Sequence, residues 1–169
     1  MQKLLFTGGS GFLGYNIRPV LEREYDVVHS LGIGENDDIK YNLAKEVPPI
    51  NTHYDVVLHA AGKAHTVPKT DAEKQVFYDV NYQGTVNLCK ALENAGVPKA
   101  LVFISTVAVY GCEFGELITE EHPLEGDSPY AESKIMAEKY LTEWCASHGV
   151  VLGILRPSLL AGRNAPGNL

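Results

Sequence analysis

The hydrophobic positions of the chain form short apolar runs, which alternate with longer stretches in which apolar residues recur every three or four positions. The short runs are typical of strands buried on both faces, and the longer stretches are typical of amphipathic helices. The runs predict six strands, of which the third is the weakest: Lys3–Thr7, Asp26–Ser30, Ile39–Tyr41, Tyr54–Ala60, Lys99–Ser105 and Val150–Leu155.

The periodic stretches predict three long helices, over Phe12–Glu24, Ala72–Ala95 and Pro129–His148. Pro19 predicts a kink or an early end in the first of them. A fourth, short helix is expected between Leu43 and Thr52, and the acidic stretch Gly111–Ser128 is expected to be a loop. Because strands and helices alternate, the sequence predicts an α/β fold with a doubly wound parallel sheet.

Composition narrows the class of protein. The chain has 169 residues, 45% of them hydrophobic, which is enough for one domain with its own core. A net charge of −7 and scattered basic residues argue against binding to nucleic acid or an anionic membrane. No stretch reaches the roughly 18 apolar residues of a membrane-spanning helix. Three distant cysteines without a C-x-x-C pair favour the reducing cytoplasm, and the histidines show no spacing typical of a metal site.

A glycine-rich turn follows the first predicted strand. The segment Thr7–Gly14 has glycines in a Gly-x-x-Gly-x-x-Gly pattern and leads directly into the first predicted helix. Glycines let the backbone approach a pyrophosphate closely, and the start of a helix offers free N–H groups to the anion. Strand, glycine turn and helix in this order predict a dinucleotide-binding site.

The end of the second predicted strand leaves the choice of dinucleotide open. An acidic residue about 20 positions after the glycines commonly binds the 2′-hydroxyl of the adenosine ribose, but His29, Ser30, Leu31 and Gly32 stand here. The missing carboxylate removes the repulsion that excludes a 2′-phosphate. Arg18 could reach such a phosphate, although no arginine cluster accompanies it. Both NAD and NADP remain candidates.

A tyrosine and a lysine are the candidate catalytic pair. Tyr130 and Lys134 are four positions apart in a predicted helix and therefore share a face, where an ammonium group can lower the pKa of a phenol. A hydroxyl of Ser105 or Thr106 could hold a reacting oxygen near the phenol for acid–base catalysis. The same spacing recurs at Tyr41 and Lys45, where no hydroxyl partner is expected.

Six ordered segments together resemble the extended short-chain dehydrogenase/reductase family, and within it the NAD-dependent epimerase/dehydratase group that acts on nucleotide sugars, including 4-epimerases. These segments are Thr7–Gly14, Asp55–Gly62, Val80–Thr85, Ser105–Gly111, Pro129–Lys134 and Leu155–Pro157. The resemblance covers essentially the whole chain. It implies a Rossmann-like fold that binds NAD or NADP, with NAD slightly favoured, and a homodimer formed through the two long helices Ala72–Ala95 and Pro129–His148.

The resemblance also implies roles for individual residues. Thr106, Tyr130 and Lys134 match the catalytic hydroxyl, the acid–base residue and the lysine that binds the nicotinamide ribose. Asn42 stands where the family usually has an aspartate near the adenine. The implied cofactor contacts are Gly8, Gly11, Phe12, Leu13, Gly14, Asn42, Leu43, Ala60, Ala61, Gly62, Lys63, Ser105, Tyr130, Lys134 and Pro157.

The resemblance further implies how much of an enzyme the chain contains. Family members normally have about twice this length, with a C-terminal substrate domain that begins near Arg163–Leu169. Residues 1–169 are therefore expected to form the NAD(P)-binding domain, with an incomplete nucleotide-sugar pocket and little turnover alone. Val107 follows Thr106 where dehydratases carry acidic residues, which favours an epimerase or a simple carbonyl reductase. The alternative is a non-catalytic module that binds NAD(P) or senses redox state.

Overall fold

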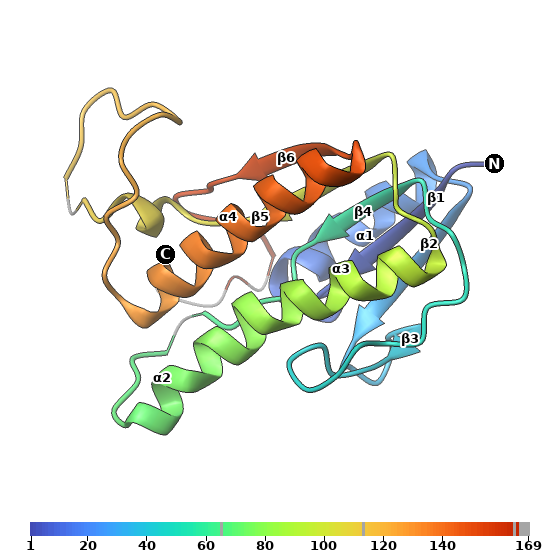
Figure 1. Cartoon of the computed structure of the whole chain (residues 1–169), viewed down its shortest axis with the longest axis horizontal. Helices are drawn as coiled ribbons and strands as arrows, with labels where there is room; N and C mark the ends of the chain where they lie inside the picture. Colours follow the sequence, from blue (N-terminus) through green and yellow to red (C-terminus); the bar gives the residue numbers. More distant parts are fainter. Residues whose placement is uncertain (65, 113, 164, 166–169) are drawn as a thin grey trace.

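The computed structural model describes residues 1–64, 66–112, 114–163 and 165. Its centre is a parallel sheet with the strand order β3-β2-β1-β4-β5-β6 (Figure 1). The strands are β1 Lys3–Thr7, β2 Val27–Gly32, β3 Ile39–Lys40, β4 Val56–His59, β5 Ala100–Ile104 and β6 Val151–Leu155. The predicted strands are thus confirmed, with bounds that differ by at most two residues. Most of the segment Arg163–Leu169, where a second domain was expected to begin, lies outside the described residues.

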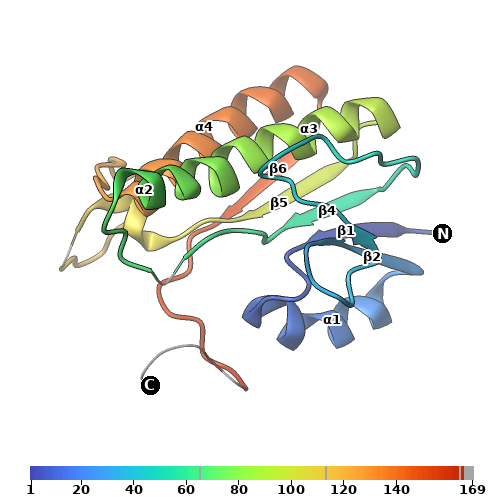
Figure 2. The ribbon, with the colours of Figure 1, turned by 90° about the horizontal axis from the view of Figure 1, so that it is seen from below.

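Helices cover both faces of the sheet. Helix α1 (Phe12–Glu24) lies on one face, whereas α2 (Asp71–Phe77), α3 (Gly84–Ala95) and α4 (Pro129–His148) lie on the other (Figure 2). Right-handed crossovers explain this division. From β1, the strands are added toward one edge of the sheet up to β3 and then toward the other edge from β4 to β6, so the connecting helices lie on opposite faces. The direction reverses between β1 and β4, and ligands of such sheets bind at the carboxyl ends of the strands at this point.

The main core fills the space between the sheet and helices α3 and α4. Side chains of three central strands and two helices are fully buried there: Leu5, Val57, Leu88, Leu92, Leu101, Phe103 and Leu141. β1 is buried along almost its whole length, whereas β4 and β5 alternate between buried residues, which face α3 and α4, and half-buried ones. This core holds the carboxyl ends of β1, β4 and β5 in fixed positions beside the start of α4.

Helices α1 and α4 have the predicted bounds. Helix α1 continues past Pro19 to Glu24, so the proline does not shorten it. Helix α4 begins after Ser128, whose hydroxyl accepts a hydrogen bond from the backbone N–H of Ala131 at 3.1 Å. It ends before Gly149, whose φ of +69° suits a glycine C-cap. Signals of this kind are local, which is why the sequence predicts these ends well.

The predicted helix Ala72–Ala95 contains an irregular turn. Its residues form α2, a π-helical segment over Tyr78–Gln83 (η1) and α3. Turns of this kind occur mostly at functional sites. The segment carries Asn81, whose amide bonds to groups outside the helix, as described below. Regular helical periodicity predicts the helix but not this widened turn.

The prediction of a fourth, short helix between Leu43 and Thr52 is wrong. Residues 43–46 form a turn, in which Asn42 Oδ1 accepts the backbone N–H of Ala44 at 3.0 Å. Pro48 and Pro49 follow at once, and because proline has no N–H donor, the turn cannot extend into a helix. Leu43 and Ile50 are nevertheless buried in the core. Their apolar spacing reflects this burial and not a helical face.

Candidate functional site

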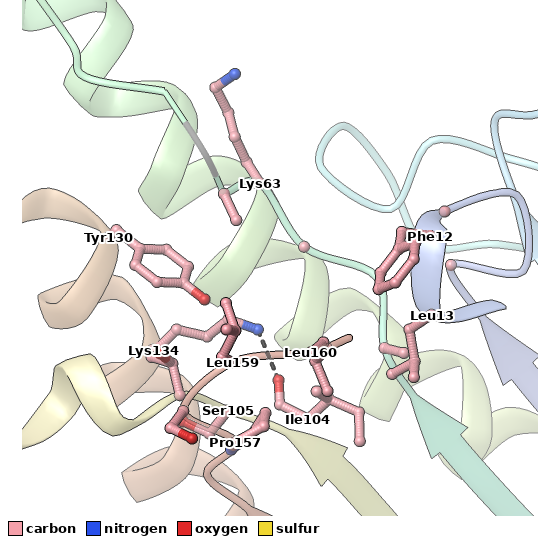
Figure 3. Close-up of a pocket in the computed structure, with 17 residues that line it drawn as sticks. Phe12, Leu13, Lys63, Ile104, Ser105, Tyr130, Lys134, Pro157, Leu159 and Leu160 are labelled. Atoms are coloured by element: carbon pink, nitrogen blue, oxygen red, sulfur yellow. Dashed lines mark hydrogen bonds between the residues drawn. The ribbon is translucent and has the colours of Figure 1, made fainter. Parts of the chain in front are cut away.

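A cavity of about 400 Å³ lies at the carboxyl ends of β1, β4 and β5, where the strand order reverses (Figure 3). It brings together the glycine turn, the loop after β4, the end of β5 and the start of α4. Twelve of the predicted site residues line it: Gly8, Gly11, Phe12, Leu13, Ala60, Gly62, Lys63, Ser105, Thr106, Tyr130, Lys134 and Pro157.

The glycine turn is shaped by two different constraints. A Cβ atom on Gly14 would lie 2.4 Å from the carbonyl oxygen of Gly9, so this glycine allows α1 to pack against the turn. A Cβ atom on Gly11 would meet only the carbonyl oxygen of Gly8, at 3.3 Å, and would otherwise extend into open space. No side chain caps the first turn of α1, which leaves its N–H groups and partial positive charge facing the cavity.

Asn81 fixes the loop that follows β4. Its Oδ1 accepts the backbone N–H of Lys63 at 2.7 Å, and its Nδ2 donates to the carbonyl oxygen of Lys63 and to Ser133 Oγ, at 3.1 and 2.9 Å. The π-helical segment thereby connects the loop to α4. Sequence reasoning missed this role, although a polar residue at a buried position of an apolar helix was a usable signal.

His59 lies beneath the same loop in a chain of buried hydrogen bonds. Its ring nitrogens face Thr7 Oγ1 at 2.7 Å and Thr85 Oγ1 at 2.9 Å. Thr85 donates its proton to the carbonyl of Asn81, so Nε2 of His59 donates to Thr85, and the neutral ring accepts from Thr7 at Nδ1. Burial, together with the nearby Lys134 charge, lowers the pKa of His59 to about 3. This histidine is therefore neutral and structural.

Two hydroxyl groups stand at the end of β5. Thr106 Oγ1 accepts the backbone N–H of Ala108 at 3.2 Å, which leaves the hydroxyl proton of Thr106 able to donate. Ser105 is only 3% exposed, and its Oγ has no hydrogen-bond partner among the described residues. A buried hydroxyl without a partner costs roughly 1–3 kcal/mol. The unpaired group points to a polar ligand that would complete its hydrogen bonding.

Tyr130 and Lys134 lie one turn apart at the start of α4 and direct their polar ends toward the same part of the cavity (Figure 3). Lys134 is 4% exposed, and its Nζ donates to the carbonyl oxygen of Ile104 at 2.8 Å. The ammonium group also lies 4.6 Å above the ring of Phe103. Burial lowers the pKa of Lys134 to about 8, although the Glu138 carboxylate acts in the opposite direction.

The electrostatics of Tyr130 differ from the expectation. Its pKa was predicted to fall because of the lysine, but burial raises it, with the Thr106 hydroxyl acting in the opposite direction. The physical reason is that Lys134 directs its ammonium group to the carbonyl of Ile104. In this structure, Tyr130 is therefore a protonated phenol at neutral pH.

Other predicted site residues do not line the cavity. Leu43 is buried in the core, and Asn42 Oδ1 is bonded to its own turn. Gly14 and Ala61 support the cavity from behind: Gly14 packs on the turn, and the Ala61 N–H donates to Thr7 Oγ1 at 3.1 Å. Lys63 does line the cavity, but its amine extends away from Ser105 and Lys134 (Figure 3).

The segment after β6 adds lining residues that the sequence did not predict. Ser158, Leu159 and Leu160 continue from Pro157 and close one side of the cavity, together with Ala64 and Ile104. Arg156 instead makes a bidentate ion pair with Glu138 of α4, at 2.7 and 3.1 Å. This ion pair holds the end of β6 against α4.

Two expectations about metals and membranes concern the chain as a whole. Within the described residues, no group of three or more His, Cys, Asp or Glu side chains is placed to hold a metal ion. None of the helices in the described part of the chain is both long and apolar enough to span a membrane.

The fold and the glycine turn define the class of protein: a Rossmann-like α/β domain with its cavity at the switch point of a parallel sheet. Residues 4–169 match the NAD dependent epimerase/dehydratase family. The chain belongs to this family.

Individual relatives agree with this assignment. The chain is 32% identical to a UDP-glucose 4-epimerase of Vibrio cholerae, over 99% of this chain and 54% of that protein. It is 31% identical to a GDP-6-deoxy-D-mannose reductase of Pseudomonas aeruginosa, over 92% of this chain and 51% of that protein. The chain thus spans about half the length of these curated relatives.

Solved structures show the same fold with both forms of the dinucleotide. A short-chain dehydrogenase/reductase superfamily protein from Agrobacterium tumefaciens with bound NAD has a TM-score of 0.77 and 25% identity, over 92% of this chain and 48% of that one. RMD from Pseudomonas aeruginosa, complexed with NADPH, has a TM-score of 0.72 and 29% identity, over 94% of this chain and 54% of that one.

Proposed function

We propose that this chain is the NAD(P)-binding and catalytic part of an oxidoreductase that acts on a nucleotide-linked sugar, by epimerase chemistry or by simple reduction. The observation that carries the proposal is that one cavity joins the uncapped start of α1 to Thr106, Tyr130 and Lys134. An anion-binding helix end and an acid–base group in the same cavity match the two needs of a dinucleotide-dependent oxidoreductase. The relatives include both an epimerase and a reductase of nucleotide sugars.

The residues present fit a bound dinucleotide. The first turn of α1 and the glycines beside it form a cradle that a side chain on Gly11 would enter. Ser105 supplies an unpaired buried hydroxyl on the opposite side of the cavity. When bound there, the nicotinamide would supply the acceptor and donor of hydride. The turn around Gly11 would hold the pyrophosphate, while Ser105 and Lys134 would hold the nicotinamide half.

The proton chemistry would come from this chain's own side chains. Thr106 has its hydroxyl proton available to donate to the oxygen of a substrate carbinol or ketone. Tyr130, a protonated phenol in this structure, would donate its proton to the carbonyl oxygen during reduction, and during oxidation it would accept a proton only after it has lost its own to solvent. Lys134 carries a positive charge below pH 8, and it would stabilise negative charge on the phenol once its ammonium group turns from the carbonyl of Ile104 toward the phenol. An epimerase needs both directions in one cycle, and a reductase needs only one.

The absence of an acidic pair next to Thr106 distinguishes these reactions from dehydration. A dehydratase needs a further acid and base beside the hydroxyl group, whereas Val107 follows Thr106 here and is partly exposed. We therefore place epimerisation and reduction ahead of dehydration. A non-catalytic cofactor-binding module is the second candidate, because burial raises the pKa of Tyr130 and Lys134 donates to the carbonyl of Ile104 instead of the phenol.

The test combines dinucleotide binding with single-turnover reduction of NAD(P) by UDP-glucose, UDP-galactose and GDP-linked sugars at millimolar concentration. The Tyr130→Phe variant should slow NAD(P)H formation by about 100-fold or more, because the proton acceptor is lost. Its dinucleotide Kd should change less than about threefold, because the phenol is not needed for binding. Tyr41→Phe is the matched control, since it removes a hydroxyl from the other Tyr-x-x-x-Lys pair, and it should change neither quantity.

Two results would overturn the proposal in different ways. If the chain binds neither NAD nor NADP in calorimetry, the assignment of the glycine turn as a dinucleotide site is wrong. If it binds a dinucleotide and no sugar reduces it, or if Tyr130→Phe reacts as fast as the native chain, the catalytic part is wrong. The non-catalytic module would then be the better description.

We also propose a homodimer in which the two long helical segments, Ala72–Ala95 (α2, η1 and α3) and Pro129–His148 (α4), pair with those of a second copy. The outward face of the α2–η1 region and α4 carries a shallow hollow, where Tyr78, Tyr82 and Met136 lie beside the polar residues Gln75, Asp79 and Gln83. Aromatic and methionine side chains are enriched at interfaces between proteins. Sedimentation equilibrium should give twice the monomer mass, and Met136→Glu should return the monomer mass. A monomer at all concentrations would contradict this arrangement.

A further inference from the structure

Two oppositely charged side chains lie one turn apart on the buried side of α4. Lys134 and Glu138 are 4% and 2% exposed, and residues at this spacing are neighbours on a helix surface and can form an ion pair. Burial lowers the pKa of Lys134 and the Glu138 charge raises it, so the two groups are close enough to interact. Yet among the described residues Lys134 makes no ion pair, and its Nζ donates to the carbonyl oxygen of Ile104.

The Glu138 carboxylate is instead occupied by Arg156, the residue that follows β6. Arg156 Nη2 donates to Oε2 at 2.7 Å and Nε donates to Oε1 at 3.1 Å, so both carboxylate oxygens face the guanidinium group. Strands β5 and β6 are neighbours, and Ile104 is paired with Leu155. Successive turns of α4 therefore contact the ends of successive strands, Lys134 at β5 and Glu138 at β6.

Arg156 is held in place by contacts other than the ion pair. Its Nη1 donates to Tyr110 Oη at 2.9 Å and to the carbonyl oxygen of Glu120 at 2.8 Å. The guanidinium group also lies 5.1 Å from the centre of the Tyr110 ring. These partners belong to segments outside α4, so they keep the guanidinium group beside Glu138 independently of the helix.

The buried carboxylate would need another partner if Arg156 were absent. An unpaired buried charge is strongly unfavourable, and the cation one turn away on the same helix is Lys134. Its bond to the carbonyl of Ile104 holds the ammonium group at the cavity, toward which Tyr130 also directs its hydroxyl (Figure 3). An ion pair with Glu138 would turn the ammonium group away from this position.

We propose that Arg156 is a positioning residue that binds Glu138 and thereby prevents Lys134 from pairing with it, so that the ammonium group stays at the cavity. The inference rests on the proposed function, because it is observed through the dinucleotide that Lys134 would hold. The ion pair also holds β6 against α4, and a purely structural ion pair would depend on both partners. In the proposed arrangement the partners are not equivalent: the loss of Arg156 frees a carboxylate, whereas the loss of the Glu138 charge frees none.

Calorimetric titration with NAD and NADP tests this asymmetry, with the dinucleotide that the native chain binds more tightly. Arg156→Met should weaken its binding by about 10-fold, as expected for the loss of one charge-assisted hydrogen bond from Lys134. Glu138→Gln should change the Kd by less than about threefold, because an amide does not draw the ammonium group away as a carboxylate would. The double variant Arg156→Met/Glu138→Gln should also stay within about threefold of the native chain, because no buried carboxylate remains.

Two controls separate the charge of Arg156 from its other contacts. Tyr110→Phe removes one hydrogen bond of Arg156 and no charge, and it should change the Kd by less than about twofold. Arg156→Lys keeps a cation beside Glu138 but lacks the planar fork of the guanidinium group, and it should recover most of the binding lost in Arg156→Met. Thermal denaturation shows whether each variant is folded at the temperature of the titration.

The outcomes distinguish this inference from the proposed function. If Glu138→Gln or the double variant binds as weakly as Arg156→Met, or if a folded Arg156→Met binds like the native chain, the positioning role is wrong and the dinucleotide site remains. If Arg156→Met does not fold, native-like binding by both Glu138→Gln and the double variant supports the role, and weakened binding by either overturns it. Binding of neither dinucleotide by the native chain would overturn the proposed function and this inference with it.

Discussion

The two ends of the cavity present different kinds of polar group, backbone groups at one end and side chains at the other. At the glycine turn, the polar groups that face the cavity are backbone atoms at the uncapped start of α1, and they lie beside the apolar side chains of Phe12 and Leu13. At the ends of β5 and α4, they are side chains: an unpaired hydroxyl on Ser105, a phenol on Tyr130 and a buried ammonium group on Lys134. The first end could bind an anion without titrating, whereas the second end can exchange protons.

The two ends of the cavity also destabilise the folded state for different reasons. The glycine turn requires small residues, and their cost is steric and conformational. The other end carries a buried cation and an unsatisfied hydroxyl, which have an electrostatic and a hydrogen-bonding cost, and His59 beneath the loop after β4 would have such a cost if it were protonated. Stability measured against pH should therefore respond to changes at the second end and hardly at all to changes at the first.

The largest expected effect is in acid and involves His59. An unfolded histidine binds a proton below pH 6.5, whereas the folded pKa of His59 is about 3. The stability that this residue contributes is therefore present above pH 6.5 and lost as the pH falls toward 3, by roughly 4–5 kcal/mol over the full window. His59→Gln should lack that part of the slope in urea denaturation.

The control for this experiment is His53→Gln, because His53 is exposed and lies on another loop. It should keep the acid slope of the native chain. If His59→Gln and the native chain lose stability in parallel between pH 6.5 and 3, the buried hydrogen-bond chain does not hold this ring neutral.

A smaller effect of the same sign, in the alkaline range, concerns Lys134. Its pKa falls from 10.5 to about 8 on folding, so stability should rise between pH 8 and 10.5, by about 3 kcal/mol in total, as the buried amine loses its charge. Lys134→Met should remove this rise, and denaturation at pH 7 to 10.5 measures it. The exposed Lys139 lies on the same helix, and Lys139→Met should keep the rise. An identical slope in Lys134→Met would mean that the amine is not desolvated.

The remaining effects concern the glycine turn and separate its two kinds of glycine, of which Gly11 gives the smallest effect on stability. Gly14→Ala should destabilise the fold by about 3 kcal/mol, because its Cβ atom would lie within 2.6 Å of the backbone of Gly8 and Gly9. Gly11→Ala should cost less than about 1 kcal/mol, yet weaken dinucleotide binding about 10-fold by filling the cradle. Thermal denaturation and calorimetry on both variants provide the measurements. Neither variant should change the pH dependence of stability, and a change would erase the contrast between the two ends.

Local signals in the sequence were sufficient for much of this architecture. Apolar runs and helical periodicity predict the strands and the bounds of α1 and α4, because burial and capping act over a few neighbouring residues. The glycine turn can also be predicted from the sequence, since its tight backbone geometry requires glycine independently of the other segments. Four-residue spacing places Tyr130 and Lys134 on one helix face for the same local reason.

Contacts between distant segments decided the rest. Asn81 reaches Lys63 and Ser133 across the fold, and this requires a π-helical turn that periodicity does not show. Asp37 is buried against the end of β2 only because its loop folds back over Gly32. The pKa of Tyr130 rises because burial outweighs the hydrogen bond from Thr106, while Lys134 donates to the carbonyl of Ile104. Burial, loop closure and long-range hydrogen bonds depend on which segments meet, so the tertiary structure determined the chemistry of residues whose positions the sequence alone had located.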